Sequence, residues 1–517
     1  MGISVEDYLL LVSLFFTVLV TIFYFYAKYS YSYWERNNVK SLKPSFPFGN
    51  FAPVFLAKKS FNEYIREIYE STTDDYIGLY ALFRPIFVPR NSELCRNIII
   101  KDFQFFHDRG VYADEKIDPL SGHLFSLSGE KWKNLRAKLT PTFTSGKLKA
   151  MFQTLIDCGD SLEKFLASEA DCNAEVEMRD LMARYTTNII ASVAFGIEVD
   201  TIAEPNAPFR HFGRKPFAPT VWNGIRNALF LILPRVAEMI KLKTVDDDYE
   251  QFIFSMVNQT IDYREKNNIN RKDFMQLLLQ LRNTGKIDYG EDWNIKSNKD
   301  DVKKLSVNEL AAQVHVFFLA GFETSSTTMS FCLYELARNP EIQAKVQTEI
   351  DQVLEKYQGK WSYDAIMEMK YLECCIDEAL RMYPPVPLLN RECTSDYQIP
   401  GTKSIIKKGT AIFIPIAGLH YDPHHFKDPT TFQPERFSAG TQNLNACSYL
   451  PFGDGPRVCI GLRLGKMQAK IGLTIILSKF NIHLGENLKH GKIKYAPESI
   501  TPTPIGGLKL RVSHRKL

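Results

Sequence analysis

The sequence predicts a mainly α-helical protein with a small β region, preceded by one membrane-spanning helix. Apolar residues recur at helical spacing through most of the chain. The strand-like runs are short: Ile86 to Val88, Ile405 to Ile406 and Thr410 to Pro415. An uncharged stretch of 20 residues, Tyr8 to Ala27, lies near the N-terminus. With 517 residues, 45% of them hydrophobic and 24% charged, the chain can bury a large core, and a disordered protein is excluded.

The uncharged stretch is predicted to cross a bilayer. At the usual rise per residue a helix of this length spans ~30 Å, which matches a bilayer core. Acidic Glu6 and Asp7 precede it and basic residues from Lys28 onward follow, so we expect a lumenal N-terminus and a cytosolic body. A cleavable signal peptide is the alternative, but the run is too long and lacks a basic n-region and a cleavage site. Aromatic residues predicted to form a belt at its far end are Tyr24, Tyr26, Tyr29, Tyr31, Tyr33 and Trp34.

The chain is predicted to have three parts. Residues 1–30 form the anchor, residues 31–50 a Pro- and Gly-containing hinge, and residues 51–517 the globular body. Lys and Arg number 63 against 59 Asp and Glu, a net charge of +4, which is too weakly basic to predict a nucleic-acid partner. Nine cysteines without a CxxC pair indicate a reducing compartment for the body.

Three further segments organise the body. A capping box at Ser306 to Glu309 begins a helix that Asn339-Pro340 ends, and its apolar residues on nearly all sides place it through the centre of the molecule. The polar stretch Asn283 to Lys304 before it is predicted to be a surface loop. The apolar segment Trp222 to Leu233 has two interpretations: a buried helix turn, or a loop that dips into the membrane interface.

The most informative segment runs from Phe452 to Gly461. Its glycines permit a tight turn that brings Cys459 to the start of a helix, where free N–H groups stabilise a thiolate. Such a thiolate can be a nucleophile, a redox sensor or a metal ligand. No neighbouring histidine suggests the base that a nucleophile needs, and an inert buried cysteine would not explain the surrounding Gly, Pro and Arg residues.

The residues Phe452, Gly455, Arg457, Cys459 and Gly461 match the signature FxxGxRxCxG, and the chain resembles the cytochrome P-450 superfamily. Further segments resemble family motifs in the family's order: Trp132 to Arg136, Ala320 to Thr324, Glu378 to Arg381 and Pro434 to Phe437. The resemblance covers roughly residues 45 to 510. Finer matches at Pro141 to Gly146 and Phe322 to Thr328 resemble the microsomal insect sixth family and its vertebrate third-family relatives.

The resemblance implies the cytochrome P-450 fold, with the long central helix over a haem b (iron protoporphyrin IX) and residues 51–517 as the catalytic domain. Cys459 is then the iron ligand, and Phe452 packs beside its sulfur. The haem propionates need cationic partners. The residues implied at this end of the haem are Trp132, Arg136, Arg391, Arg457 and Arg109, the last with a solvated surface position as its alternative.

Glu378 and Arg381 lie at i, i+3 on a helix whose neighbours are apolar, so the pair is predicted to be buried. A buried pair needs a third partner, and the resemblance supplies Arg436 for this structural role. The histidines weighed as metal ligands, without a zinc-like spacing, are His315, His420, His424 and His425.

Gly321 stands in the middle of the central helix, where glycine costs roughly 1 kcal/mol against alanine. It indicates either close helix packing or an opening for dioxygen. The Thr324 hydroxyl is expected to bond the carbonyl four residues back. The resemblance implies that Thr324 and Glu323 deliver protons during oxygen activation, with an ion pair as the alternative role of Glu323.

The resemblance also implies a reaction, a place and partners. One oxygen atom of O₂ enters an apolar small molecule at the endoplasmic reticulum membrane. The electrons come from NADPH through the flavin enzyme cytochrome P-450 reductase. Cytochrome b5 is an optional second donor. Foreign compounds such as plant toxins or insecticides are the expected substrates; hormone or fatty-acid oxidation, a haem-thiolate isomerase and a haem binder without turnover are the alternatives. Predicted substrate contacts are Phe103, Phe106, Phe317, Ala320 and Leu388. Basic candidates for the reductase side are Lys131, Lys133, Lys138, Arg463, Lys466 and Lys470.

Overall fold

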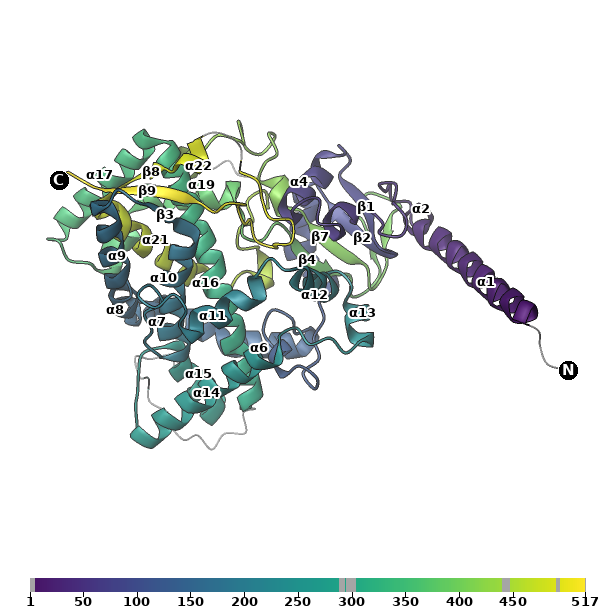
Figure 1. Cartoon of the computed structure of the whole chain (residues 1–517), viewed down its shortest axis with the longest axis horizontal. Helices are drawn as coiled ribbons and strands as arrows, with labels where there is room; N and C mark the ends of the chain where they lie inside the picture. The colour runs from purple at the N-terminus through teal and green to yellow at the C-terminus, as the bar shows by residue number, and fades with distance from the viewer. Residues whose placement is uncertain (1–4, 288–292, 294–303, 439–446, 490–492, 517) are drawn as a thin grey trace.

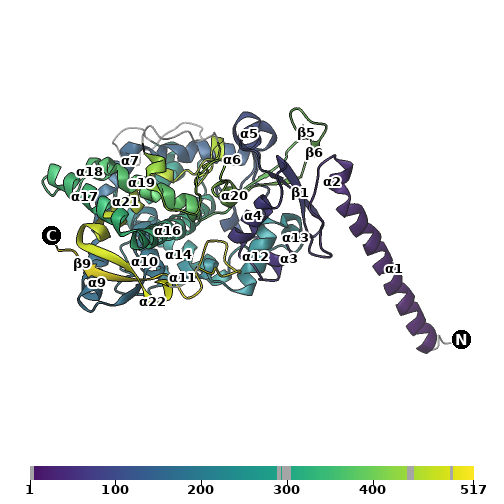
Figure 2. The ribbon, with the colours of Figure 1, turned by 90° about the horizontal axis from the view of Figure 1, so that it is seen from above.

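The computed structural model of this chain describes residues 5–287, 293, 304–438, 447–489 and 493–516. A helix-rich body carries a smaller β region at one end, and the helix α1 (Val5–Tyr31) projects away from that end (Figure 1, Figure 2). The predicted fold class is confirmed. The predicted loop Asn283 to Lys304 falls largely outside the described residues.

The helices of the body follow in chain order. They are α2 (Tyr33–Arg36), α3 (Ala52–Phe55), α4 (Phe61–Glu70), α5 (Ser92–Arg96), α6 (Gly129–Leu139), α7 (Ser145–Ala150), α8 (Phe152–Asp157), α9 (Asp160–Asp171), α10 (Met178–Ile190), α11 (Pro208–Arg214), α12 (Val221–Leu231), α13 (Pro234–Met239), α14 (Asp247–Asn267), α15 (Phe274–Thr284), α16 (Val307–Arg338), α17 (Pro340–Lys356), α18 (Tyr363–Glu368), α19 (Lys370–Met382), α20 (Ile416–Leu419), α21 (Leu462–Lys479) and α22 (Glu486–Lys489).

The strands are β1 (Tyr76–Ala81), β2 (Arg84–Pro89), β3 (Glu175–Glu177), β4 (Leu389–Glu392), β5 (Tyr397–Gln398), β6 (Ile405–Ile406), β7 (Ala411–Ile414), β8 (Phe480–Leu484) and β9 (Lys509–His514). The short apolar runs form the strands β2, β6 and β7 of the β region near α1, while the sheet of β3, β8 and β9 lies at the other end of the body (Figure 1). Sheets have the orders β1-β2-β7-β4, β3-β9-β8 and β5-β6. In the largest, β2 and β7 are parallel and the other neighbours antiparallel. Antiparallel pairing with Ile412 fixes Arg391 on β4.

The central helix α16 forms as its capping box predicts. The Glu309 backbone N–H donates to the Ser306 hydroxyl at 3.1 Å, and the Ser306 N–H donates to the Glu309 carboxylate at 2.8 Å. The helix has 32 residues, which corresponds to about 48 Å. It packs against α10, α14, α15, α19 and α21, so most of its side chains are buried on every side. It therefore forms the axis around which the core is built.

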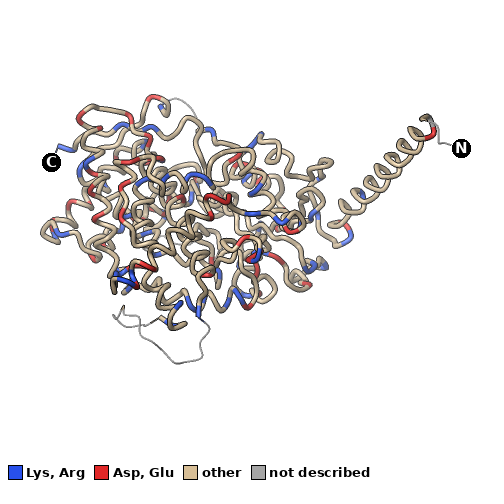
Figure 3. The backbone as a smooth tube through the Cα atoms, turned by 60° about the horizontal axis from the view of Figure 1, so that its bottom comes forward, with Lys and Arg blue, Asp and Glu red and all other residues tan. Residues whose placement is uncertain are grey.

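The helix α1 is long and apolar enough to cross a membrane from Asp7 to Tyr31, and none of that apolar window is buried in the body. Figure 3 shows charged residues only towards its ends. Tyr24, Tyr26 and Tyr29 are exposed, as the aromatic belt requires. By length, composition and exposure, α1 is compatible with a membrane anchor.

Trp34 does not belong to that belt, which corrects the prediction. Its side chain is 0% exposed, and its Nε1–H donates to the Leu79 carbonyl at 2.9 Å. It fills the space above Gly78, where a Cβ would lie 2.4 Å from the indole ring. The chain continues along the same sheet, since the Gly78 N–H donates to the Lys40 carbonyl and the Asn50 N–H to the Tyr80 carbonyl. Residues after α1 are thus attached to β1, which fixes where the anchor leaves the body.

Candidate active site

The glycine-rich turn brings Cys459 to the start of α21, as predicted. Gly453 and Gly455 have φ of +68° and +70°, and a Cβ at Gly455 would lie 2.1 Å from the Ile99 carbonyl oxygen. No other residue type fits that close approach. The Cys459 N–H donates to the Phe452 carbonyl at 2.9 Å, which closes the turn three residues before Leu462 begins the helix.

Cys459 is exposed at the start of α21, and three groups act on the charge of its thiol. The residue is exposed, yet burial by the surrounding protein raises the pKa of its thiol. The Gly461 N–H and the positive charges of Arg109 and Arg136 act in the opposite direction and lower that pKa. An accessible sulfur with a backbone donor and two cations near it is the environment that a thiolate ligand requires.

Three arginines line the same region, two of them buried and Arg109 half-buried, and each has a buried guanidinium nitrogen without a hydrogen-bond partner. These nitrogens are Nε of Arg109, Nε of Arg391 and Nη1 of Arg457. Burial, together with the charges of the other two arginines, lowers the pKa of Arg391 well below its ordinary value. The acidic neighbour is Asp108, 3.4 Å from Arg457 Nη2. Clustered buried cations of this kind need anionic partners.

The two remaining predicted residues, Trp132 and Arg136, join this cluster from α6. The Arg457 guanidinium carbon lies 4.1 Å from the centre of the Trp132 ring. Arg136 is near enough to lower the pKa of the Cys459 thiol. The surface alternative for Arg109 is wrong, because its Nε is buried and its guanidinium lies 4.2 Å from the Phe125 ring centre.

This arrangement fits a haem. The cysteine supplies a soft ligand for iron, and the unpartnered N–H groups of the arginines match the two propionate carboxylates. The donors come from α6, β4, the segment around Arg109 and the cysteine turn, four elements far apart in the sequence.

The helix α16 is most accessible to solvent around Ala320, near its middle. Ala320 is exposed, and Leu319, Gly321 and Thr324 are half-buried, while most of the rest of α16 is buried. The Thr324 hydroxyl donates to the Ala320 carbonyl at 2.7 Å, as predicted. On the other side of this turn, Gln468 of α21 donates to the Gly321 carbonyl at 2.9 Å. The helix that follows Cys459 therefore holds the turn that carries Thr324.

The structure supports close helix packing as the role of Gly321 and an ion pair as the role of Glu323. A Cβ at Gly321 would lie 2.3 Å from Ile190 Cδ1, so the glycine permits close packing of α16 on α10. Glu323 is 4% exposed, pairs with Arg179 and accepts a hydrogen bond from the Thr501 hydroxyl at 3.0 Å. Its part in proton delivery stays a prediction, and that role requires the carboxylate to leave this pair.

The predicted buried pair is present with its third partner. Arg381 donates to Glu378 through Nε at 2.8 Å and through Nη2 at 2.9 Å, and Arg436 Nε donates at 3.1 Å. Glu378 and Arg381 are both 0% exposed. Arg381 Nη1 also donates to the His420 carbonyl at 2.8 Å. This network joins α19 to the segment that precedes the cysteine turn.

His420 connects the network to that turn and is kept neutral. Its Nε2 accepts the Leu450 N–H at 2.9 Å, so its proton is on Nδ1, which faces the Arg381 carbonyl. Burial lowers the pKa of His420 to about 3, with a smaller contribution from the Arg381 charge.

Acid is therefore expected to destabilise the fold through His420. Because its folded pKa lies below the unfolded value, the unfolded chain binds more protons between about pH 6.5 and 3, and stability falls as the pH falls through that window. At pH 5 the contribution is about 2 kcal/mol. Urea unfolding at pH 7 and pH 5 measures it: a His420→Asn variant should lose about that much of the pH dependence. The exposed His424→Asn is the control, and an equal change in both variants would contradict the assignment.

The predicted substrate contacts are only partly together. Phe103 packs on Trp132, with 5.9 Å between ring centroids. Phe106 is 0% exposed against Tyr397, and Leu388 is buried against the sheet, so both have packing roles here. Phe317 lies against Phe143 at 5.4 Å. Of the five, Ala320 is the one that is exposed.

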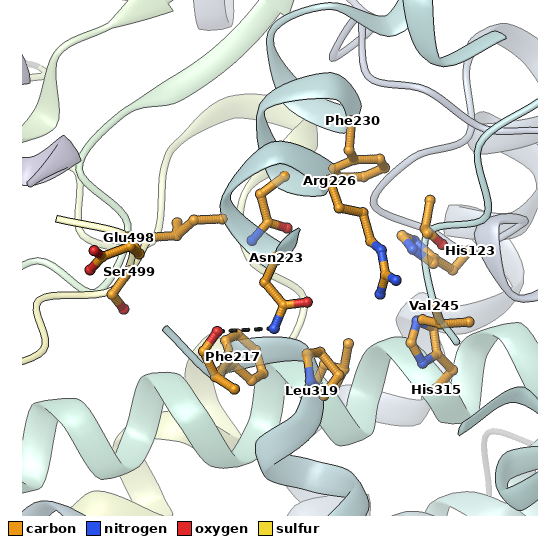
Figure 4. Close-up of a pocket in the computed structure, with 15 residues that line it drawn as sticks. His123, Phe217, Asn223, Arg226, Phe230, Val245, His315, Leu319, Glu498 and Ser499 are labelled. Atoms are coloured by element: carbon orange, nitrogen blue, oxygen red, sulfur yellow. Dashed lines mark hydrogen bonds between the residues drawn. The ribbon is translucent and has the colours of Figure 1, made fainter. Parts of the chain in front are cut away.

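Two cavities lie beside α12, and the first of them also borders α16. One of about 140 Å³ is shown in Figure 4, and its walls include His123, Phe217, Arg226, Phe230, His315 and Leu319. The other, of about 280 Å³, is lined mainly by apolar residues that include Phe48, Phe55, Phe61, Val221, Leu229 and Ile232. Asn227 and the segment Glu498 to Ile500 belong to both walls. A sequence signal for the first cavity that the sequence analysis missed is the i, i+4 spacing of His315 and Leu319, which puts both on one face of the helix before Thr324.

The helix α12 exposes apolar side chains and buries polar ones, the reverse of a helix on the surface of a soluble protein. Trp222 and Ile225 are 55% and 46% exposed, whereas the polar Asn223 and Arg226 are buried. Met239 at the end of α13 is 83% exposed, and Ile240 just after it is 56% exposed. The interpretation of this segment as a buried core turn is therefore wrong for its first part, whereas Ile232 near its end is buried. Both views place α12 and α13 at the end of the body from which α1 leaves (Figure 1, Figure 2).

Comparison with known proteins agrees with this site. The family model described as "Cytochrome P450" matches residues 41–508. "Probable cytochrome P450 6d5" of Drosophila melanogaster is 42% identical over 500 residues, 96% of this chain and 98% of the fly protein. "Cytochrome P450 6d3" of Musca domestica is 38% identical, covering 98% and 99%, and "Cytochrome P450 6a2" of Drosophila melanogaster 40%, covering 93% and 95%. The chain therefore belongs to the cytochrome P450 family of haem-thiolate monooxygenases, and its relatives are members of the insect sixth family.

Proposed function

We propose that this protein is a monooxygenase of the endoplasmic reticulum membrane that oxidises apolar foreign compounds with NADPH electrons from a flavin reductase. The observation that supports it best is the exposed Cys459 with the charges of Arg109 and Arg136 near its thiol and with buried, unpartnered N–H groups in the arginine cluster. Plant toxins and insecticides are the expected substrate class, and residues 51–517 are the catalytic domain.

In this proposal the haem, when bound, supplies the oxygen-activating chemistry. Cys459 would give the iron a thiolate whose charge Arg109 and Arg136 moderate. Arg391 and Arg457 would hold the propionate carboxylates, and the Trp132 ring keeps the Arg457 guanidinium in position. The Thr324 hydroxyl, anchored to the Ala320 carbonyl, would turn away from that carbonyl and pass on its proton at the exposed turn of α16. Glu323 would return a proton to the hydroxyl oxygen once it separates from Arg179, and would regain its own from water.

Electron transfer calls for a docking surface on the cysteine side. Lys131, Lys133 and Arg463 are exposed there and support the proposal. Lys470, by contrast, is 0% exposed and contacts Glu373 at 3.3 Å, so the prediction that it contributes to the docking surface is wrong. Lys466 is held by Asp377 at 2.8 Å. These two lysines attach α21 to α19 instead.

The proposed function is tested with purified full-length protein, purified reductase and NADPH. We expect NADPH consumption that depends on the reductase and an oxygenated product that contains one atom from labelled O₂. A haem binder without turnover would consume no NADPH above background. An isomerase acting on peroxides would form its product without reductase. Either result would contradict the monooxygenase assignment.

The exposed apolar face of α12 and α13 supports a second contact with the membrane, in addition to α1. We predict that Trp222 lies at the depth of the lipid chains, because burial of its indole in lipid removes apolar surface from water while Asn223 stays inside the protein. In vesicles that contain brominated phosphatidylcholine, the full-length protein should show a quenched fluorescence component that a Trp222→Phe variant lacks. Equal quenching in both proteins would place the α12 face outside the lipid.

A further inference from the structure

The smaller cavity has a polar end. Figure 4 shows His123, His315 and Arg226 together on one side, with Glu498 and Ser499 on the other. The rest of the wall is mostly apolar, with Phe217, Phe230, Val245 and Leu319. A cavity of about 150 Å³ holds a benzene-sized group, so this one of about 140 Å³ accepts one end of a substrate rather than all of it.

The two histidines form a neutral pair. Their ring centroids are 5.8 Å apart. The Ser126 N–H donates to His123 Nδ1 at 3.3 Å, which leaves the proton of the neutral ring on Nε2. His315 Nδ1 lies 3.0 Å from the Tyr249 hydroxyl. Burial lowers the pKa of His123 to about 3 and that of His315 well below its ordinary value, so both rings are uncharged at neutral pH. Among the described residues, neither Nε2 has a hydrogen-bond partner.

Arg226 adds N–H groups without adding a free charge. It is 9% exposed and forms an ion pair with Asp246 at 2.5 Å. Its Nε is buried and has no hydrogen-bond partner. Its guanidinium lies beside the two histidines in the cavity wall (Figure 4), so an acceptor at this end of the cavity has N–H donors near it. A ligand with a carboxylate would need a cation whose charge is not yet balanced, and the Arg226 charge is already balanced by Asp246. The cavity therefore favours a neutral acceptor.

We propose that His123, His315 and Arg226 form a polar subsite that selects apolar substrates carrying a neutral oxygen acceptor, such as an ester or ketone carbonyl. The proposal rests on the monooxygenase function above and narrows its substrate class. His315 precedes Thr324 by nine residues on α16, a rise of about 13 Å. A substrate whose carbonyl is held at the histidines therefore presents a remote carbon to the turn that carries Thr324.

The test compares methyl dodecanoate, tridecane and dodecanoic acid as probes, by the change that each causes in the absorption spectrum of the haem-loaded full-length protein. The wild type should bind the ester about tenfold tighter than the alkane of similar length. His123→Leu and His315→Leu should reduce ester affinity to that of the alkane and leave alkane affinity unchanged. Tyr249→Phe, which keeps the ring but loses the hydroxyl beside His315, should cause a smaller loss of ester affinity. His211→Leu, the same substitution at an exposed position, is the matched control.

Three results would overturn the subsite: an unchanged ester-to-alkane ratio in both leucine variants, tighter binding of the acid than of the ester, or oxidation of the ester next to its carbonyl. Should a leucine variant fail to bind haem, Tyr249→Phe decides, and full retention of ester affinity in that variant would contradict the proposal. Reductase-dependent oxidation of tridecane by the wild type is measured in the same series. Its absence, with ester selectivity intact, would refute the monooxygenase function and leave the polar subsite standing.

Discussion

A Glu378→Ala variant is expected to lose roughly 3–5 kcal/mol of folding free energy and most of its haem. The substitution leaves Arg381, which is 0% exposed, without the carboxylate that accepts two of its hydrogen bonds. It also removes the partner of the Arg436 Nε. Because a folded domain is stable by only about 5–15 kcal/mol, this loss is a large part of the total. Urea unfolding, followed by haem absorbance and by circular dichroism, measures both effects.

The control is the exposed pair of Arg66 and Glu70, which lie four residues apart on α4 and have a 2.7 Å contact. Glu70→Ala should change the unfolding free energy by no more than about 0.5 kcal/mol. A combined Glu378→Leu and Arg381→Met variant should recover part of the loss, since it no longer buries an unpaired charge. A Glu378→Ala protein that unfolds like the wild type would show that the network does not stabilise the fold.

A Thr324→Ala variant is expected to form product about 100-fold more slowly while it still consumes NADPH. The hydroxyl bonds only the Ala320 carbonyl of its own helix among the contacts described, so its removal should leave the fold unchanged. What is lost is the donor at the exposed turn of α16. The measurement is the ratio of product formed to NADPH oxidised, with purified reductase and a single apolar substrate.

Thr328 provides the control for this variant because it has the same geometry one turn later. Its hydroxyl donates to the Thr324 carbonyl at 2.8 Å, and the residue is buried. Thr328→Ala should keep the wild-type ratio of product to NADPH, and Thr324→Ser should restore most of it. Equal ratios in Thr324→Ala and the wild type would remove the hydroxyl from the mechanism.

Local signals in the sequence predicted much of this structure. The capping box at Ser306 to Glu309 defined the start of α16, and the paired glycines before Cys459 defined its turn. The hydrogen bond of Thr324 also followed from the helix alone, because its acceptor is four residues away. Each of these features depends on residues that are close together in the chain.

The features that the sequence did not predict depend on distant residues. Trp34 was assigned to the membrane interface, and its burial depends on the absence of a side chain at Gly78. Lys470 was expected at the surface, and Glu373 of another helix holds it inside. Phe317 was a predicted substrate contact, whereas Leu319 of the same helix, and not Phe317, lines the smaller cavity. Because α16 is apolar on nearly all sides, its periodicity does not indicate which side faces the cavity.

The central claim is that Cys459 is the thiolate ligand of a haem, and the CO difference spectrum of the reduced full-length protein tests it most directly. The wild type should show a strongly red-shifted Soret band, and Cys459→Ser should lose it while remaining folded. Cys172→Ser, at an exposed cysteine, should keep the band. A red-shifted band that persists in Cys459→Ser, or its absence from folded and haem-loaded wild type, would contradict the assignment of Cys459.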